Sequence, residues 1–207
     1  MVFLVLTFAY IIIVGNARFV MFNEDIYKKM LEKHGSYSRL QNADEIIGNI
    51  FDFLKHKDEL GDYGYTEKEI NHMDDVRNTF DIMISLFYLF IVADLMIILV
   101  LFYYFRLNIM NLLKIFRNAA FAVIGLGTAL LISSLISFYN TFVALHYLFF
   151  KPGSFMLSRT TLLKQLLPDP LFKDILMRIS INVMITSFVI IILSYVLILS
   201  YRQKKIL

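Results

Sequence analysis

Four long, predominantly apolar stretches alternate with polar segments along this chain. They cover residues 1–22, 79–105, 119–145 and 179–201. Because an α-helix rises ~1.5 Å per residue, each stretch is long enough to cross a hydrocarbon layer of ~30 Å. The pattern therefore predicts an all-α membrane protein with four transmembrane helices.

The first apolar stretch has two interpretations. A membrane anchor over residues 1–22 fits its length, and the apolar core of a secretory signal peptide is also of this kind. Signal peptides carry positive charge before that core, whereas no Lys or Arg precedes Val2 here. We therefore favour the anchor, and the missing charge leaves open a natural start upstream of Met1.

Residues 23–78 form the longest polar segment and hold 13 of the 17 acidic residues. A helix start at residues 42–45 leads into an apolar stripe of near-helical spacing that begins at Ile46. Residues 66–69 (TEKE) have the spacing of a capping box, which marks a second helix start. We therefore expect a helical cap between the first two transmembrane helices, with its last helix continuing into the second.

The distribution of basic residues indicates the orientation. Residues 106–118 carry three basic residues and no acid, and the tail 202–207 is also basic. The positive-inside rule favours both in the cytoplasm, although residues 146–178 carry five basic residues as well. We therefore expect a multi-pass protein of the cell membrane with its cap on the extracytoplasmic face.

From the N-terminus, the expected order is transmembrane helix 1 (1–22), extracytoplasmic cap (23–78), transmembrane helix 2 (79–105), cytoplasmic loop (106–118), transmembrane helix 3 (119–145), extracytoplasmic loop (146–178), transmembrane helix 4 (179–201) and cytoplasmic tail (202–207).

Composition agrees with this class and excludes others. The 207 residues are 58% hydrophobic and only 18% charged, which is too apolar for a soluble domain of this size. The absence of Cys excludes disulfides, thiolate metal sites and a cysteine acyl-enzyme. Since the net charge is only +3, with no dense run of Lys or Arg, we expect no nucleic-acid binding.

The predicted topology brings two histidines to one membrane interface. Helix 2 starts, and helix 3 ends, on the same face, so His72 and His146 are expected at the same depth. An imidazole, with a pKa of ~6.5, can take and give a proton near neutral pH, so the two could form a base and acid pair. Interfacial anchoring is the alternative. We expect His34 and His56 to be solvated residues without partners.

Other chemistries have weaker support. Glu69-x-x-His72 has the spacing of carboxylate di-iron sites, but the second such pair is missing. A zinc site of His72, Asp75 and His146 would be an unusual ligand set. We therefore expect no metal and no cofactor.

A serine nucleophile and an intramembrane acid were also considered. The chain has no Gly-x-Ser-x-Gly elbow. Asp94 lies near the middle of helix 2, where a buried carboxylate could serve a proton path. We favour a structural role, in which Asp94 hydrogen-bonds to a serine of helix 3.

Two segments that contain these histidines carry a family resemblance. Residues 69–76 (EINHMDDV) and 140–150 (NTFVALHYLFF), with 166–172 (LLPDPLF) downstream, resemble the lipoprotein intramolecular transacylases of Gram-positive bacteria. The four-helix layout with a cap extends the resemblance over essentially the whole chain. A tryptophan expected after the second segment is missing, and Phe155 or Met156 stands in that region.

The resemblance implies an acyltransferase. Its reaction moves the acyl chain at the sn-2 position of a diacylglyceryl-cysteine onto the α-amino group of that cysteine, giving a lyso-form lipoprotein. The attacking nitrogen and the acyl carbon close a ring of roughly eight atoms, so folding the substrate supplies proximity and no protein nucleophile is needed. The implied partners are diacylated lipoproteins and membrane lipid, and we expect a monomer.

The resemblance also implies roles for individual residues. His72 and His146 match the catalytic pair, and which of them is the base stays open. Glu69, Asp75 and Arg77 would support catalysis: Asp75 by orienting His72, and Arg77 by contacting an oxyanion or a lipid phosphate, unless it merely snorkels. The expected substrate contacts, which an aromatic membrane belt would resemble, are Tyr139, Asn140, Phe142, Tyr147, Phe149 and Phe150.

Two further classes of protein stay open on the residues alone. A non-enzymatic membrane adaptor would bind a partner through its cap and tolerate replacement of both His72 and His146. A small transporter or channel subunit would depend on Asp94 instead.

Overall fold

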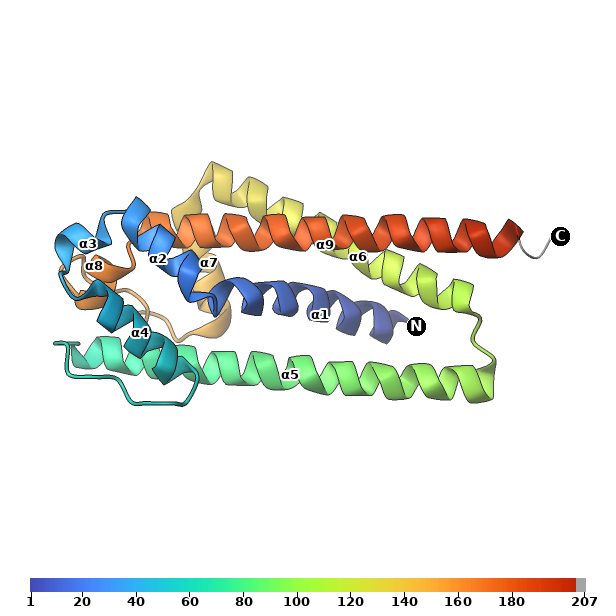
Figure 1. Cartoon of the computed structure of the whole chain (residues 1–207), viewed down its shortest axis with the longest axis horizontal. Helices are drawn as coiled ribbons and strands as arrows, with labels where there is room; N and C mark the ends of the chain where they lie inside the picture. Colours follow the sequence, from blue (N-terminus) through green and yellow to red (C-terminus); the bar gives the residue numbers. More distant parts are fainter. Residues whose placement is uncertain (204–207) are drawn as a thin grey trace. The chain divides into compact units, whose positions relative to one another are not determined.

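The computed structural model describes residues 1–203, and α-helix is the regular secondary structure throughout that part of the chain (Figure 1). The helices are α1 (Val2–Met21), α2 (Glu24–Lys33), α3 (Ser36–Arg39), α4 (Ala43–Leu54), α5 (Glu67–Phe105), α6 (Ile109–Ile136), α7 (Phe138–Phe149), α8 (Leu162–Leu166) and α9 (Asp169–Gln203). Four of them, α1, α5, α6 and α9, are long and apolar enough to span a membrane. The predicted all-α membrane protein with four transmembrane helices is confirmed.

The chain divides into two compact units, which we describe separately. The first, here called the membrane unit, comprises Met1–Arg18, Met83–Ile132 and the part of the chain from Ile179 onward. The second, here called the cap unit, comprises Phe19–Ile82 and Ser133–Arg178.

The membrane unit is held together by apolar packing and a few polar contacts. Ile12 of α1, Val123 of α6 and Val183 of α9 form a buried cluster. The rings of Phe8 and Phe116 stack with centroids 4.2 Å apart. Close packing between helices is the main stabilising interaction where the surrounding solvent is lipid.

Asp94 has a partner in this unit, but not the one predicted. It is 5% exposed and accepts a hydrogen bond of 2.7 Å from Thr7 Oγ1 of α1. The prediction of a serine partner on helix 3 was therefore wrong, because α1 packs against this part of α5 and supplies Thr7 instead. One carboxylate oxygen of Asp94 has no hydrogen-bond partner among the described residues.

The third apolar stretch is not one helix over residues 119–145. It starts earlier, at Ile109, and breaks at Ser137, whose backbone is extended (φ −154°, ψ 96°). The Ser137 hydroxyl accepts a hydrogen bond from the Asn140 N–H, so this serine caps α7. The loop predicted over residues 106–118 is therefore shorter in the structure, because α6 begins at Ile109 and covers most of that segment.

The last helix also starts earlier than predicted. α9 begins at Asp169 rather than at residue 179, with Pro170 in its first turn. Proline is tolerated there because the first N–H groups of a helix have no intrahelical partner. Of the predicted tail 202–207, residues 204–207 lie outside the described part of the chain.

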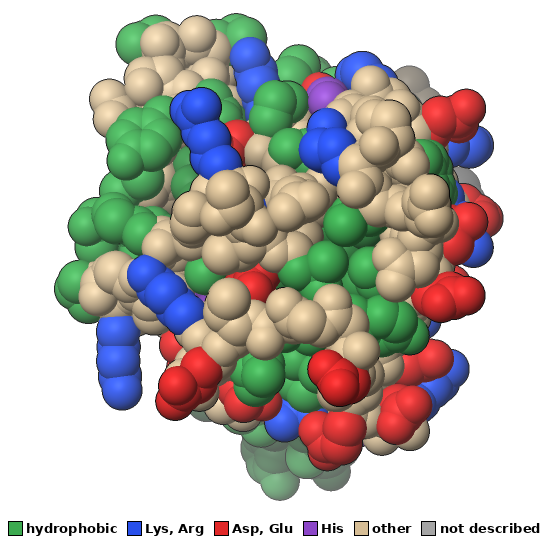
Figure 2. All heavy atoms as spheres, turned by 90° about the vertical axis from the view of Figure 1, so that its left-hand side faces the viewer, with side chains coloured by type: hydrophobic (Ala, Val, Ile, Leu, Met, Phe, Trp, Pro, Cys, Tyr) green, Lys and Arg blue, Asp and Glu red, His purple; other side chains and the backbone are tan. Residues whose placement is uncertain are grey.

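The cap unit has its own hydrophobic core. Buried apolar residues of α2 and α4 meet in it, and the rings of Tyr27 and Phe51 contact edge to face at 5.1 Å. α4 begins at Ala43, where the sequence predicts a helix start, although Asn42 makes no side-chain cap hydrogen bond. Figure 2 shows Asp and Glu side chains gathered along the lower and right margins of the polar end of this unit.

The predicted capping box is present and starts α5. The Thr66 N–H donates to Glu69 Oε2 at 2.8 Å, and the Glu69 N–H donates to Thr66 Oγ1 at 3.3 Å. From there α5 runs without a break to Phe105, as the sequence predicts.

The two cap histidines expected to lack partners both have one. His34 Nε2 lies 2.9 Å from Asp174 Oδ2, which also accepts from the Lys33 ammonium. His56 Nε2 lies 3.0 Å from both carboxylate oxygens of Asp81. The expectation was wrong because each pair joins residues that are distant in the sequence.

Candidate active site

His146 is held in a defined state by its own helix. It lies near the end of α7, and its Nδ1 atom is 2.8 Å from the carbonyl oxygen of Phe142, one turn earlier. Because a carbonyl oxygen only accepts, Nδ1 carries the hydrogen. In the neutral ring, the lone pair that can take a proton is then on Nε2.

His72 occupies a different environment. It lies in the polar turns of α5 that follow the capping box and precede the apolar span. Its ring is half-buried, and its Nδ1 atom is buried without a hydrogen-bond partner among the described residues. No hydrogen bond to Nδ1 therefore fixes the tautomer of His72, and a bound group can select either tautomer.

Phe150 brings the two imidazoles together. Its ring centroid lies 5.3 Å from that of His72 and 5.4 Å from that of His146. The cap unit thus brings one histidine from α5 and one from α7 into contact with a single aromatic side chain.

Further aromatic rings surround His146. The Phe142 ring lies 3.8 Å from the imidazole and the Phe155 ring 4.9 Å. Phe155 is only 4% exposed and stands in the region where a tryptophan was expected. The site is therefore apolar on the side of His146.

The other predicted substrate contacts are more exposed. Tyr139 and Asn140 lie in the first turn of α7, and Tyr139 is 66% exposed. Tyr147 contacts the Phe155 ring at 5.4 Å, while Phe149 is 52% exposed. Of the six predicted residues, Phe142 and Phe150 are the ones whose rings contact a histidine.

Glu69 ties the site's two polypeptide segments together. Its side chain is fully buried, and one oxygen completes the capping box with Thr66. The other oxygen accepts a 2.7 Å hydrogen bond from the Leu163 N–H at the start of α8. Glu69 therefore anchors the loop after α7 to α5, three residues before His72.

Burial controls the protonation of both imidazoles. Loss of solvent lowers the pKa of His72 to about 4, with a further lowering by His146, and Asp75 opposes this shift. Burial likewise lowers the pKa of His146, against the effect of its bond to Phe142. Both rings are therefore neutral at pH 7.

Lys164 is a charged residue of the site that the sequence did not indicate. Its positive charge helps to lower the pKa of His72 and of His146. It forms an ion pair with Asp169 and lies 5.7 Å from the Phe142 ring centroid. Nothing in the local sequence of α8 distinguishes it, because only the fold brings α8 to the histidines.

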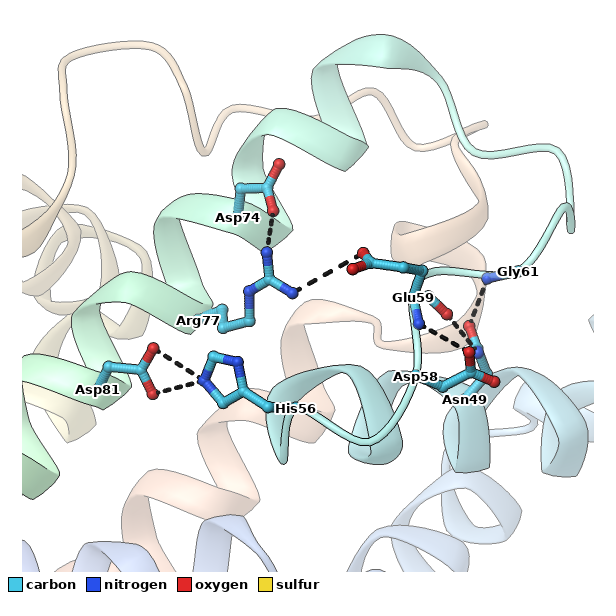
Figure 3. A network of polar contacts seen from close by, with 8 residues as sticks. All are labelled: Asn49, His56, Asp58, Glu59, Gly61, Asp74, Arg77 and Asp81. Atoms are coloured by element: carbon cyan, nitrogen blue, oxygen red, sulfur yellow. Dashed lines mark hydrogen bonds and ion pairs between the residues drawn. The ribbon is translucent and has the colours of Figure 1, made fainter.

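Arg77 belongs to a separate polar network (Figure 3). Its guanidinium pairs with Asp74 at 3.0 Å and with Glu59 at 3.9 Å, and it lies 4.0 Å over the Phe53 ring. These contacts hold the loop before α5 against the helix. They give Arg77 a structural role in the cap unit.

A hollow opens beside His72. Its volume is about 320 Å³, and it is lined by Glu67, Lys68, Asn71, His72 and Ser154. The residues that line the hollow all carry polar groups, in contrast to the aromatic rings around His146. Among the described residues, His72, Asp75 and His146 do not form a group that could hold a metal ion.

Two neutral imidazoles beside one aromatic ring can pass protons to and from a bound substrate without a protein nucleophile. With four membrane-spanning helices, they define a membrane-integral protein equipped for acid–base chemistry. The family model of the lipoprotein intramolecular transacylase Lit matches residues 1–172. The chain therefore belongs to the Lit family and is an acyltransferase, which sets aside the adaptor and transporter interpretations.

Solved structures support the same fold. The in meso structure of the lipoprotein intramolecular transacylase Lit from Bacillus cereus superposes with a TM-score of 0.79 at 17% identity, covering 98% of this chain and 95% of that one. Two variants of that enzyme, in which one histidine is replaced by arginine or by alanine, superpose with TM-scores of 0.78 at 15% identity, covering 98% of this chain and 92% or 93% of theirs. A comparison with curated proteins gives no match.

Proposed function

We propose that this chain moves the acyl group at the sn-2 position of a diacylglyceryl-cysteine lipoprotein onto the α-amino group of the same cysteine. The product is a lyso-form lipoprotein with an N-acyl chain. The observation that carries the proposal is that His72 and His146 both contact the ring of Phe150. Family membership supplies the lipoprotein as the substrate class.

The two imidazoles are suited to different roles. His146 presents an unprotonated Nε2 because its Nδ1–H is bound to the Phe142 carbonyl oxygen, so it acts as the general base toward the attacking amine. His72 has no fixed tautomer, and the polar hollow beside it leaves room for the departing glycerol oxygen. We therefore assign proton donation to His72.

The reaction balances without a co-reactant. The amine nitrogen bonds to the acyl carbon while the bond from that carbon to the sn-2 oxygen breaks. His146 takes the proton that leaves the nitrogen and passes it to the neutral His72, directly or through the solvent of the hollow. His72 then delivers this proton to the glycerol oxygen, so both rings end neutral as they began.

The aromatic rings serve the geometry of this step. Phe142, Phe150 and Phe155 enclose His146 and would keep a folded glyceryl group against it. A ring of roughly eight atoms closes more readily when the ends of the substrate are confined. The Lys164 ammonium lies 5.7 Å from the centroid of the Phe142 ring, which contacts His146, and would stabilise negative charge on the acyl oxygen.

We place the cap unit and this site on the extracytoplasmic face. The support is the basic segment 106–118, which the positive-inside rule favours in the cytoplasm. We also propose that the protein acts as a monomer.

A lipopeptide labelled with deuterium only in its sn-2 acyl chain tests the proposed transfer. The purified protein should move the label into an amide at the N-terminus, read by tandem mass spectrometry, with the total mass unchanged. An N-acetylated lipopeptide is the matched control and should not react. Transfer of the unlabelled sn-1 chain, or release of free fatty acid, would contradict the proposal.

A further inference from the structure

A hollow of about 320 Å³ opens beside His72. Resting on the proposed function, we infer that this hollow binds the peptide backbone of the residues that follow the lipidated cysteine. The lining residues are Glu67, Lys68, Asn71, His72 and Ser154.

The chemistry of the substrate demands such an opening. The attacking nitrogen and the first peptide carbonyl carbon are attached to the same Cα, so the polypeptide leaves the site within two bonds of the reacting atom. Phe142, Phe150 and Phe155 close the surroundings of His146 with apolar rings, where unpaired peptide groups would be costly. The hollow at the other histidine, whose lining residues all carry polar groups, meets the requirement.

The hollow is preformed by contacts between its two walls. One wall is the start of α5, and the other is the loop after α7. The Lys68 ammonium donates a 2.7 Å hydrogen bond to the Met156 carbonyl oxygen, and Leu163 is bound to Glu69. Its volume of about 320 Å³ lies at the small end of the range of ligand pockets, ~300–1,000 Å³.

Asn71 is the residue best suited to bind peptide groups. It is exposed, precedes His72 directly, and its side chain makes no hydrogen bond within the described part of the chain. A carboxamide offers a donor and an acceptor, which matches a peptide unit. The Ser154 hydroxyl donates to the Lys151 carbonyl oxygen at 2.9 Å, and its own oxygen is available to accept from a peptide N–H.

These partners recognise the backbone rather than particular side chains. The charged rim residues, Glu67 and Lys68, carry opposite charges, so the hollow has no net preference for an acidic or a basic peptide. The enzyme should therefore accept lipoproteins of varied sequence and gain affinity from peptide length.

Two substrates test this inference with the full-length protein. One is S-diacylglyceryl-cysteine amide, and the other is the same lipid on the tetrapeptide Cys-Ser-Ser-Ser. We expect the wild type to show about tenfold higher kcat/KM for the tetrapeptide, as two added hydrogen bonds would give. Asn71→Ala should reduce this ratio to near one. Asn42→Ala, which alters an exposed side chain without a cap hydrogen bond, should keep it.

The ratio of kcat/KM for the two substrates supports or overturns the inference. Equal kcat/KM for the two substrates with the wild type, or a full preference for the tetrapeptide in Asn71→Ala, would overturn the inference while leaving the acyl transfer intact. Failure of the wild type to acylate either amine would instead remove the proposed function, and the inference with it. A thermal unfolding measurement on Asn71→Ala shows that any loss is not a loss of fold.

Discussion

The Nδ1 atom of His146 lies 2.8 Å from the carbonyl oxygen of Phe142, one turn earlier in α7. This bond directs the basic lone pair of the neutral ring to Nε2. No comparable bond fixes His72 among the described residues, where Nδ1 is buried without a partner. The two imidazoles therefore differ in state although they share Phe150.

Phe150 should be required for the geometry of the pair. In Phe150→Leu, the flat ring that contacts both imidazoles is lost while an apolar side chain is kept. We expect kcat for acyl transfer to fall by about tenfold or more, because small displacements of reacting groups are costly. Leu148→Ala, which removes a side chain that is 74% exposed in the last turn of α7, is the control. An unchanged kcat in Phe150→Leu would contradict this role.

The pH dependence of the reaction should report the lowered pKa values. Burial lowers the pKa of His146 below the value of 6.5 that is usual for an imidazole. The base therefore stays unprotonated to a lower pH, and the acidic limb of kcat against pH should lie below pH 6.5. Lys164→Met removes a positive charge that lowers the pKa of both histidines, so the limb should move to higher pH.

The control for this profile is Lys28→Met, an exposed residue of α2, which should leave the limb in place. An acidic limb that stays fixed, or moves to lower pH, in Lys164→Met would show that Lys164 does not act on the pair.

Glu69 should be a determinant of stability. Glu69→Ala leaves the buried Leu163 N–H without its acceptor and removes the capping contact with the exposed Thr66, and we expect a loss of about 3 kcal/mol in the free energy of unfolding. Denaturation in detergent micelles measures it. Glu45→Ala, at an exposed position of α4, should leave the free energy of unfolding unchanged. Equal stability of the two variants would exclude the anchoring role.

The absence of Cys makes the orientation directly measurable. A single cysteine at the exposed position Lys28 should react with a membrane-impermeant maleimide in intact cells, since the cap is placed outside. A cysteine at the exposed position Asn111 should react only after the cells are opened. The reverse labelling pattern would place the site in the cytoplasm.

Features with strong local signals could be predicted from the sequence. The length of the apolar stretches predicts four membrane-spanning helices, and the spacing of Thr66 and Glu69 predicts the start of α5. The break at Ser137 could not be predicted, because apolar residues continue on both sides and a serine in a membrane helix also fits close packing.

Contacts between distant segments were the other failures. His34 and Asp174 pair because the fold of the cap unit brings them together, and the hydrophobic periodicity of the sequence does not predict such a contact. For the same reason, the sequence does not indicate that Lys164, a lysine in a short helix, belongs to the site. It also does not indicate the hydrogen bond between Glu69 and Leu163. The prediction that His72 and His146 lie close together rested on a common depth at the ends of two spanning helices, whereas His146 lies in α7, beyond the break at Ser137.

The central claim is tested most directly by mass spectrometry of a reporter lipoprotein in a host that lacks N-acylation. The chain is expressed as the wild type, His72→Ala, His146→Ala or the control His56→Ala, and insertion is checked by membrane fractionation. The account predicts an acyl chain on the N-terminal amine, at unchanged total mass, with the wild type and His56→Ala, and a free amine with the other two. Transfer that persists in His72→Ala or His146→Ala would contradict the paired-histidine mechanism, and a free amine with the wild type would contradict the acyl transfer itself.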